Sequence, residues 1–307
     1  MLDLLVIGDA NPDVLVSGAP DQPPYGQAET LVEHGLLALG GSAAIVAHGA
    51  AKLGLATGLA AMVGRDPAGD FVLDVLSSAG VDVSACVRHD ALPTALTVCL
   101  NRGGGDRAIL TAPGCLPEFG PDHVRLVPAR HVHSASYFLQ PRLAAGLPEL
   151  FRAVLASGAS TSLDTNHDPS GRWRLAPGLL AASTFVLPNE AEAVALSGAD
   201  GVDDALVALA AAGPSPVVKV GGRGCVALHA GTTITARPPA RDPVDTVGAG
   251  DSFDAGFLAG WLDRGDVRHA LALGCAGGAL STRGAGGTAT QPTMAEAIEL
   301  ARLVAVI

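Results

Sequence analysis

The residues best suited to chemistry form a glycine-rich turn that leads into an apolar helix. Gly248, Ala249, Gly250 and Asp251 precede apolar side chains that recur at helical spacing. Glycine lets a backbone approach a ligand closely, and the unpaired N–H groups of a first helical turn attract anions. A carboxylate among them would repel phosphate unless it faces a group that carries a proton. Asp251 is therefore a candidate base, and the alternative is an ordinary helix capped by Asp or Ser.

Polar side chains near the N-terminus are suited to binding a polyol. Asn11 and Asp13 follow the first predicted strand, and an amide beside a carboxylate can hydrogen-bond adjacent hydroxyl groups. The alternative is an Asx turn that ends the strand. Further along, Gly40 and Gly41 form a di-glycine turn that enters a helix at Ser42.

Two more polar turns follow predicted strands, where groups gather at the binding face of an open sheet. Asp164, Asn166 and Asp168 alternate along the chain, so a continuing strand would place all three on one side. Asn189 opens a predicted helix, and Glu192 stands three residues later, as in reciprocal helix capping. The alternatives are turn chemistry for the first group and capping for the second.

Lysine is rare in this chain, which makes Lys219 informative. Lys52 and Lys219 are the only two lysines among 19 residues of Lys and Arg, so the ammonium at 219 is interpreted as a selected group. The glycine-rich turn after it contains Gly221, Gly222 and Gly224 and permits close approach of a ligand.

The composition describes a folded globular chain without a nucleic-acid surface. The 307 residues are 49% hydrophobic and 16% charged, and the formal charge of -11 disfavours nucleic acid as a partner. Five widely spaced cysteines include no Cys-x-x-Cys pair, so neither a disulfide framework nor a zinc site is expected. Charges and glycines interrupt the apolar stretch 36–64, which predicts a buried helix and strand and no membrane span. No targeting segment is recognised, and the expected location is cytoplasmic.

Apolar runs alternate with helical patterns over most of the sequence. This alternation predicts an α/β fold, a doubly wound and mostly parallel sheet with helices on both faces, as a single domain over 1–307. Segments 12–39 and about 90–112 contain only strands and turns, and predict a small β-sheet lid with a hairpin tip at 101–106. Strands are expected at 3–8, 57–63, 96–101, 107–111, 131–134, 160–164, 184–187, 216–220 and 225–228, and helices at 41–53, 68–79, 143–157, 190–197, 202–212, 250–263, 266–282 and 293–304.

Together these turns resemble the signatures of the ribokinase-like (PfkB) family of carbohydrate kinases, with matches from residue 8 to residue 287. The resemblance implies transfer of the γ-phosphate of MgATP to an alcohol group of a small sugar or sugar-like acceptor. It also implies a homodimer that uses the lid. The sequence contains neither a P-loop nor a protein-kinase catalytic loop, so it does not belong to those classes.

The resemblance implies a role for each matching residue. Asp251 would be the base beside an anion hole formed by Gly248, Ala249 and Gly250. Asn189 and Glu192 would organise Mg2+, partly through water. The expected acceptor-binding residues are Asn11, Asp13, Gly40, Gly41, Ser42 and Asp251, and the expected ATP-binding residues are Asp164, Asn166, Asn189, Lys219, Gly221, Gly222, Gly224, Thr246, Gly284 and Ala285. Asp245 would hold a monovalent cation, K+, together with the 284–287 loop.

One departure from the family leaves the acceptor open. Ile45 stands where many members carry Asn, and its side chain cannot form a hydrogen bond. A nucleoside kinase is the alternative, favoured by an aromatic wall near Tyr25, Phe119 or Phe138. A non-catalytic sugar or nucleotide sensor is a further alternative, whereas a dehydrogenase is disfavoured because no Gly-x-Gly-x-x-Gly follows the first strand.

Overall fold

The computed structural model describes residues 1–102 and 107–307, so the predicted hairpin tip at 101–106 lies largely outside the described residues. Its main sheet has nine strands in the order β15-β14-β13-β12-β11-β10-β9-β1-β4. The neighbouring strands from β12 through β11, β10, β9 and β1 to β4 pair in parallel. Strands β13, β14 and β15 extend the sheet beyond β12 in antiparallel pairs. The strands are β1 (Leu2–Ile7), β4 (Thr57–Ala60), β9 (Ala129–Ser134), β10 (Ser160–Leu163), β11 (Phe185–Val186), β12 (Ser215–Lys219), β13 (Cys225–His229), β14 (Thr232–Arg237) and β15 (Ala305–Val306).

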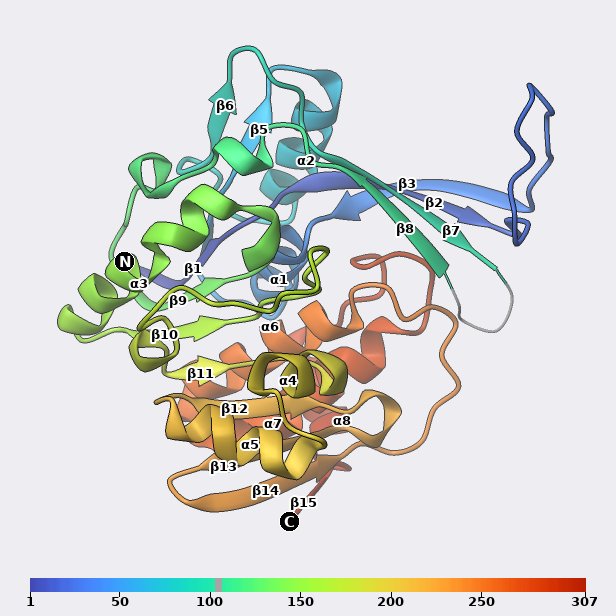
Figure 1. Cartoon of the computed structure of the whole chain (residues 1–307). Helices are drawn as coiled ribbons and strands as arrows, with labels where there is room; N and C mark the ends of the chain where they lie inside the picture. The colour runs from blue at the N-terminus through green and yellow to red at the C-terminus, as the bar shows by residue number, and fades with distance from the viewer. Residues whose placement is uncertain (103–106) are drawn as a thin grey trace.

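Helices cover both faces of this sheet (Figure 1). The alternation along β1 explains why: Leu4 and Val6 enter the core beneath α1 and α6, whereas Leu5 and Ile7 enter a second core beneath α3. The predicted doubly wound fold is therefore confirmed. The helices are α1 (Ser42–Lys52), α2 (Pro67–Ser78), α3 (Pro141–Ala156), α4 (Glu190–Ser197), α5 (Val202–Ala211), α6 (Ala249–Arg264), α7 (Val267–Ser281) and α8 (Met294–Ala301).

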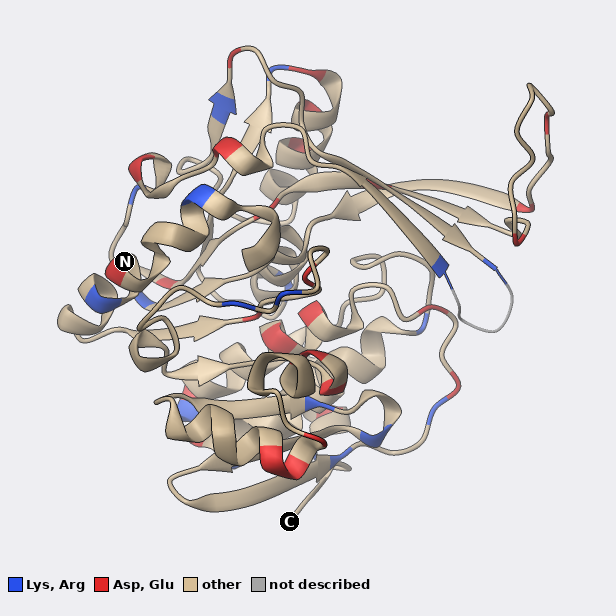
Figure 2. Ribbon diagram, in the orientation of Figure 1, with Lys and Arg blue, Asp and Glu red and all other residues tan. Residues whose placement is uncertain are grey.

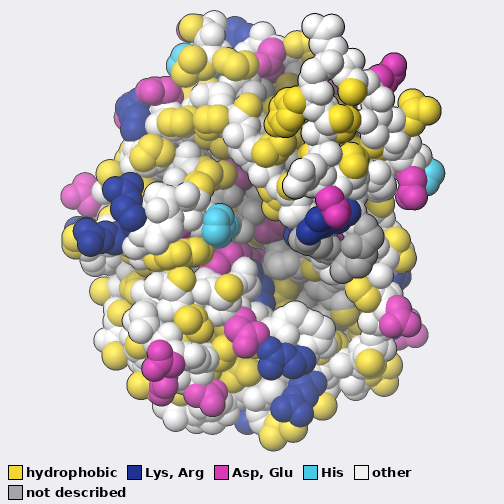
Figure 3. Space-filling model, turned by 45° about the vertical axis from the view of Figure 1, so that its right-hand side comes forward, with side chains coloured by type: hydrophobic (Ala, Val, Ile, Leu, Met, Phe, Trp, Pro, Cys, Tyr) yellow, Lys and Arg dark blue, Asp and Glu magenta, His cyan; other side chains and the backbone are white. Residues whose placement is uncertain are grey.

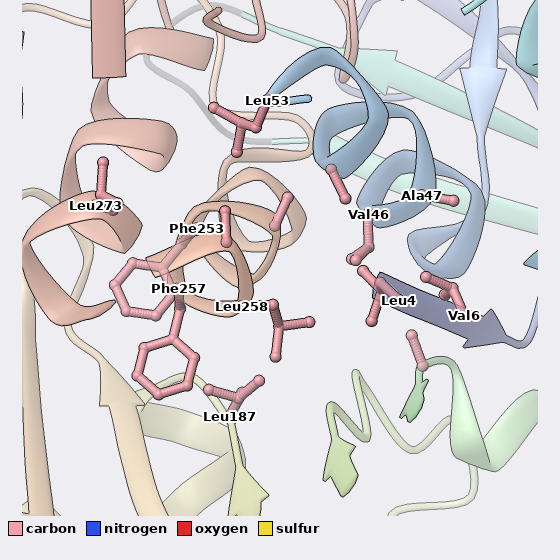
Figure 4. Close-up of a cluster of buried hydrophobic side chains, with 14 of the residues drawn as sticks. Leu4, Val6, Val46, Ala47, Leu53, Leu187, Phe253, Phe257, Leu258 and Leu273 are labelled. Atoms are coloured by element: carbon pink, nitrogen blue, oxygen red, sulfur yellow. The ribbon is translucent and has the colours of Figure 1, made fainter. Parts of the chain in front are cut away.

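The largest core fixes the helix that carries the candidate base. Phe253 and Phe257 of α6 pack among buried side chains of β1, α1 and α7, including Val46 and Leu273 (Figure 4). Burying such side chains stabilises the fold by roughly 1.5 to 3 kcal/mol each. Helix α6 is thus buried along most of its length, and its first turn lies beside Lys219, the last residue of β12.

A second, four-stranded sheet forms the predicted lid. It has the order β3-β2-β7-β8 and extends from one side of the main body (Figure 1). Strand β2 starts four residues after β1 ends, and β3 ends one residue before the N-cap of α1, so both join the lid directly to the site. The lid strands are β2 (Asn11–Ser17), β3 (His34–Gly40), β7 (Leu96–Asn101) and β8 (Arg107–Ala112).

The structure refines three expectations about elements. The strand expected at 57–63 is split, because β5 (Met62–Gly64) leaves the main sheet and pairs with β6 (Val87–His89). Strands β14 and β15 were absent from the sequence prediction. The apolar stretch 36–64 forms the end of β3, then α1, β4 and β5. In the described parts of the chain, no helix is both long and apolar enough to cross a membrane.

Candidate active site

The first turn of α6 is the centre of the site. Its N-cap is Gly248, whose φ of 68° suits glycine, and no side chain caps the turn. A Cβ at Gly248 would lie 2.6 Å from the backbone of Gly287, so glycine is also required by the close approach of that loop. Asp251 is the third helical residue and is buried. The capping alternative therefore does not describe Asp251. The N–H of Ala249 donates to the backbone oxygen of Thr246 (3.3 Å), and the N–H groups of Gly250 and Asp251 are the ones placed to bind an anion.

One ammonium group and three carboxylates meet beside this turn. Lys219, at the end of β12, places Nζ 2.6 Å from Oδ2 of Asp164 and 3.1 Å from Oδ2 of Asp254. Oxygen atoms of Asp164, Asp251 and Asp254 lie within 4.8 Å of one another. Figure 2 shows acidic segments gathered at the start of α6 and on the neighbouring α4. Three elements far apart in sequence thus build one charged cluster.

Burial sets the charge states in this cluster. Burial and the charge of Asp164 raise the pKa of Asp251 to about 8, although Lys219 acts in the opposite direction. Burial would also raise the pKa of Asp164, but the ammonium of Lys219 holds it below its usual value. Burial raises the pKa of Asp254 well above its usual range, and a hydrogen bond to Asp164 adds to the effect. Burial therefore favours the neutral form of Asp254, Lys219 favours the charged form of Asp164, and the pKa of Asp251 lies at about 8.

A chain of hydrogen bonds connects Asp251 to the ends of three strands. Ser136 donates from Oγ to Oδ2 of Asp9 (2.7 Å) and from its N–H to Oδ1 of Asn166 (2.7 Å). Asn166 donates from Nδ2 to Oγ of Ser42 (2.9 Å), and Ser42 hydrogen-bonds Asp251. Ser136 and Asn166 both have positive φ, at 56° and 54°. Such backbone strain persists only where surrounding contacts impose it, and it is concentrated at functional sites.

The alternation predicted after β10 does not hold. Strand β10 ends at Leu163, and the left-handed backbone of Asn166 turns the chain away from an extended path. Asp168 instead accepts hydrogen bonds from the N–H groups of Ser170 (2.8 Å) and Trp173 (2.7 Å) within its own loop. It lies apart from the cluster, and the expectation that it shares a side with the preceding polar residues is wrong.

The predicted acceptor residues meet where the lid joins the main body. Asn11 donates from Nδ2 to Oδ1 of Asp13 (2.9 Å), and both side chains are buried. Gly40 lies opposite Asn11 in the β2–β3 pair, where a Cβ would collide with the carboxylate of Asp13. Gly41 is the N-cap of α1, with a φ of 85°. Burial and the nearby charge of Asp9 raise the pKa of Asp13 to about 7.

Asn189 and Glu192 form the predicted capping box at the start of α4. The N–H of Asn189 donates to Oε2 of Glu192 (2.9 Å), and the N–H of Glu192 donates to Oδ1 of Asn189 (3.0 Å). Glu192 is buried, and burial with the charge of Asp164 raises its pKa to about 7. A buried carboxylate with this penalty on its charge gains from a bound cation, so a capping role and a metal role are compatible.

The glycine turn after Lys219 borders a cavity. Gly221 and Gly224 have positive φ, and a Cβ at Gly224 would collide with the backbone oxygen of Ala236. The cavity has a volume of about 610 Å³ and is lined by Gly222 and Arg223 of the turn, among others. None of its lining residues belongs to the Lys219 cluster. In Figure 3 the surface is hollowed between the lid and the lower half of the molecule, with acidic side chains around the hollow.

The loop predicted to hold a monovalent cation does meet its partner loop. Asp245 accepts from the N–H of Val247 (3.0 Å) through Oδ1 and from the N–H of Gly286 (2.9 Å) through Oδ2. Thr246 and Ala285 are exposed on the two loops. The carboxylate of Asp245 therefore connects the 284–287 segment to the loop before α6 through these two hydrogen bonds.

Ile45 contributes an apolar contact to the same region. The side chain is buried, and its Cδ1 would lie 2.9 Å from a Cβ placed at Gly287. Gln291 secures the position, because its Nε2 donates to the backbone oxygen of Ile45 (3.0 Å) and to Oγ of Ser252 (3.0 Å). Gly284 packs against a threonine methyl group at the far end of the loop. Isoleucine here fills space against the loop and supplies no polar group from its side chain.

The aromatic wall required by the nucleoside alternative is mostly absent from its predicted positions. Tyr25 is 97% exposed on the loop beyond the lid strands, and Phe119 is fully buried in the core beneath α3. Phe138 packs against Trp173, with 5.6 Å between ring centroids. Phe119 is therefore too deeply buried to stack on a ligand, whereas Tyr25 lies on an exposed loop.

Three site residues were missed by the sequence analysis. Asp254 lies three residues after Asp251, and this helical spacing was a signal that both would share a face. Asp9 directly precedes the predicted Asn11 turn and was available as a candidate. Ser136 carried no sequence signal, because a single serine after a strand is common and its partners lie elsewhere in the chain.

Comparisons with known proteins agree with this geometry. The family model described as pfkB family carbohydrate kinase matches residues 1–294. The chain is 33% identical over 306 residues to an ATP-dependent ribose-1-phosphate kinase from Halopiger xanaduensis, covering 95% of this chain and 96% of that protein.

Solved structures share the fold over almost the whole chain. A putative ribokinase from Agrobacterium tumefaciens has a TM-score of 0.86 at 25% identity, covering 98% of this chain and 97% of that one. A putative ribokinase II from E. coli in complex with ATP and Mg2+ has a TM-score of 0.84 at 21% identity, covering 98% of this chain and 99% of that one. The predicted ribokinase-like fold with its lid sheet is confirmed.

Proposed function

This chain belongs to the pfkB family of carbohydrate kinases and is an ATP-dependent sugar kinase, and we propose that its acceptor is a pentose or a pentose phosphate. The observation that carries the site assignment is the buried Asp251 at an uncapped helix start, between a polar acceptor side and a glycine-rich nucleotide side. The 33% identity to a kinase named for ribose 1-phosphate supports the acceptor class.

Asp251 acts as the general base in this proposal. It takes the proton of the acceptor hydroxyl while the new O–P bond forms and the bond from the γ-phosphorus to the bridging oxygen breaks, with its electron pair leaving on ADP. The N–H groups of Gly250 and Asp251 at the start of α6 stabilise the negative oxygens of the transferring group. The base and the anion hole are thus consecutive residues of one buried helix.

The donor set at α4 fits Mg2+, a hard cation that prefers oxygen ligands and retains water. Asn189 and Glu192 present amide and carboxylate oxygens. Burial raises the pKa of Glu192 to about 7, and a cation bound there would offset this penalty and favour the charged carboxylate. When bound with ATP, Mg2+ neutralises charge on the phosphate oxygens. The glycine turn from Gly221 to Gly224 permits close approach of the nucleotide, and Asp245 with the 284–287 loop would hold K+.

Asn11 and Asp13 bind hydroxyl groups of the acceptor. They stand at the junction of lid and body, so closing of the lid and binding of the sugar involve the same residues. Gly40 and Gly41 let the sugar approach the backbone, and Ser42 hydrogen-bonds the base. The apolar side chain of Ile45 favours an acceptor that requires no hydrogen bond there.

The lid also offers a surface for a second copy of the chain. Its edge strands expose Leu36 and Leu37 of β3, and Ile109 and Leu110 of β8, each between 44% and 59% exposed. Edge strands with exposed apolar side chains are prone to pair with other chains. We infer a homodimer through the lid. Leu110→Asp should lower the mass measured by light scattering to that of one chain, and an unchanged mass would overturn the inference.

The acceptor is tested by measuring ADP release with a matched panel. Ribose, ribose 1-phosphate, fructose and adenosine would be compared at equal MgATP, with kcat/KM as the measure. The proposal expects the pentose or its phosphate to exceed fructose and adenosine. A preference for adenosine would establish the nucleoside alternative, and release without any acceptor preference would contradict the proposal.

A further inference from the structure

Lys219 lies at the centre of the acidic cluster, and it is one of only two lysines in the sequence. Its Nζ lies 2.6 Å from Asp164 and 3.1 Å from Asp254, and only 11% of the side chain is exposed. A Cβ built on Gly250 would lie 3.5 Å from the same Nζ, which places the ammonium directly beside the first turn of α6. The ammonium is thus adjacent to the anion hole and to Asp251 at once.

The charges of this cluster nearly cancel without Asp251. Oxygen atoms of Asp164 and Asp254 lie within 4.8 Å of each other, and burial, which raises the pKa of Asp254 well above its usual range, favours the neutral form of Asp254. The remaining negative charge at Asp164 is matched by the ammonium of Lys219. Without the ammonium, Asp251 would face an unmatched carboxylate within 4.8 Å, and two carboxylates at that separation do not ionise together easily.

We propose that Lys219 is a positioning residue for proton transfer: held between Asp164 and Asp254, its ammonium offsets the charge of Asp164, so that Asp251 loses its proton at a lower pH than it would without the ammonium. This inference rests on the proposed role of Asp251 as base. Lys219 acts through the charge of Asp164 and needs no contact with substrate. Asp254 fixes the ammonium in place, since both of its oxygens accept from Nζ, at 3.2 and 3.1 Å.

The other elements around Asp251 supply no second positive charge in the described structure. Asp9, after β1, adds a negative charge, and Ser42 of α1 contributes a hydrogen bond. Helix α7 faces the start of α6 with glycines: a Cβ at Gly277 or Gly278 would lie 2.5 or 3.0 Å from α6 backbone oxygens. The carboxylate of Glu192 from α4 acts on Lys219. The ammonium of Lys219 is therefore the group that must offset the carboxylates.

The proton transfer itself is balanced by the reaction. The acceptor O–H bond breaks and an O–H bond forms on Asp251, while the acceptor oxygen bonds to the γ-phosphorus and ADP leaves with the electron pair. An Asp251 that is already protonated cannot accept this proton. Removal of the ammonium should therefore act mainly at neutral and acidic pH, and a higher pH should restore the rate.

The test is a set of pH profiles of kcat/KM for Lys219→Met, Lys219→Arg and Lys219→Met combined with Asp164→Asn. The loss of an opposite charge should move the acid limb of Lys219→Met upward by about 1 to 3 pH units. Lys219→Arg keeps the positive charge, so the acid limb of its kcat/KM profile should lie at the same pH as in the unchanged protein. The double variant removes both opposing charges, so its limb should return toward that of the unchanged protein. Lys52→Met, which changes the other lysine, should leave the limb in place.

The titration can also be followed without any acceptor. In protein labelled with 13C at aspartate carboxyl carbons, the Asp251 signal is identified by its loss in Asp251→Asn, and its midpoint should rise in Lys219→Met. An unmoved midpoint, or a loss of rate that is equal at every pH with a raised KM for ATP, would overturn the inference. If instead Asp251→Asn keeps the acid limb, the base assignment itself fails. The two failures are therefore distinguishable, and the double variant supplies a folded protein if Lys219→Met is unstable.

Discussion

The two sides of Asp251 handle buried charge in different ways. On the nucleotide side, Asp164 and Asp254 surround the ammonium of Lys219. On the acceptor side, Asp13 accepts from the amide of Asn11, and its pKa rises to about 7 through burial and the charge of Asp9, although the charge of Arg107 acts in the opposite direction. A fixed ion pair suits the side that must hold constant charge near phosphate. A carboxyl group close to its titration point suits the side that must exchange hydrogen bonds with hydroxyl groups.

Removal of the base should have the largest effect on turnover and should leave the nucleotide side and the acceptor side folded as they are. Asp251→Asn keeps the shape but cannot accept a proton, so kcat should fall by about 10² to 10⁴. ATP affinity should be retained, because the anion hole is formed by backbone N–H groups. The checks are turnover, ATP affinity and melting temperature. A rate within about threefold of the unchanged protein would end the base assignment.

The pH profile should separate the two sides. Asp251 must be ionised to act, and its pKa in the free protein is about 8, so kcat/KM should fall about tenfold per unit as pH drops below 8. The fall should steepen below about 7, where Asp13 takes up its proton. Asp13→Asn should remove the lower step, and its KM for the acceptor should rise roughly 10- to 100-fold through loss of a charge-assisted hydrogen bond. A profile that is flat from pH 6 to 8 would contradict both assignments.

Glu192→Gln should weaken the nucleotide side selectively. Loss of the carboxylate should raise the Mg2+ concentration needed for half-maximal rate by roughly tenfold, with little change in acceptor KM. The chain offers a matched control, because Glu296 forms an equivalent capping box with Thr293 on α8. Glu296→Gln should cost about 1 kcal/mol of stability and leave Mg2+ dependence unchanged. If Glu192→Gln behaves like this control, Glu192 is a cap alone.

The smallest expected effect concerns a monovalent cation. Because Asp245 clasps the 284–287 loop beside the start of α6, K+ should stimulate turnover relative to Na+ or an organic cation. Asp245→Asn should abolish the difference between cations. Equal rates of the unchanged protein in the three salts would rule the cation site out.

The sequence determined features that depend on neighbouring residues. The turn from Gly248 to Asp251 and the capping box of Asn189 and Glu192 were predicted because helix starts and backbone approach are local requirements. The order of strands and helices followed for the same reason, since periodicity is read within one segment. Family resemblance then joined these turns into one predicted site.

Only the tertiary structure decided which charges meet. Lys219 pairs with Asp164, 55 residues away, and with Asp254, 35 residues away, and no local pattern specifies such pairs. The spacing of Asp254 from Asp251 indicated a shared helix face, but its contact with Lys219 depends on how the buried helix α6 packs against β12. The raised pKa of Asp251 likewise comes from burial and from neighbours brought together by folding. Charge states depend on distance in space, and distance in space is set by the packing of the whole chain.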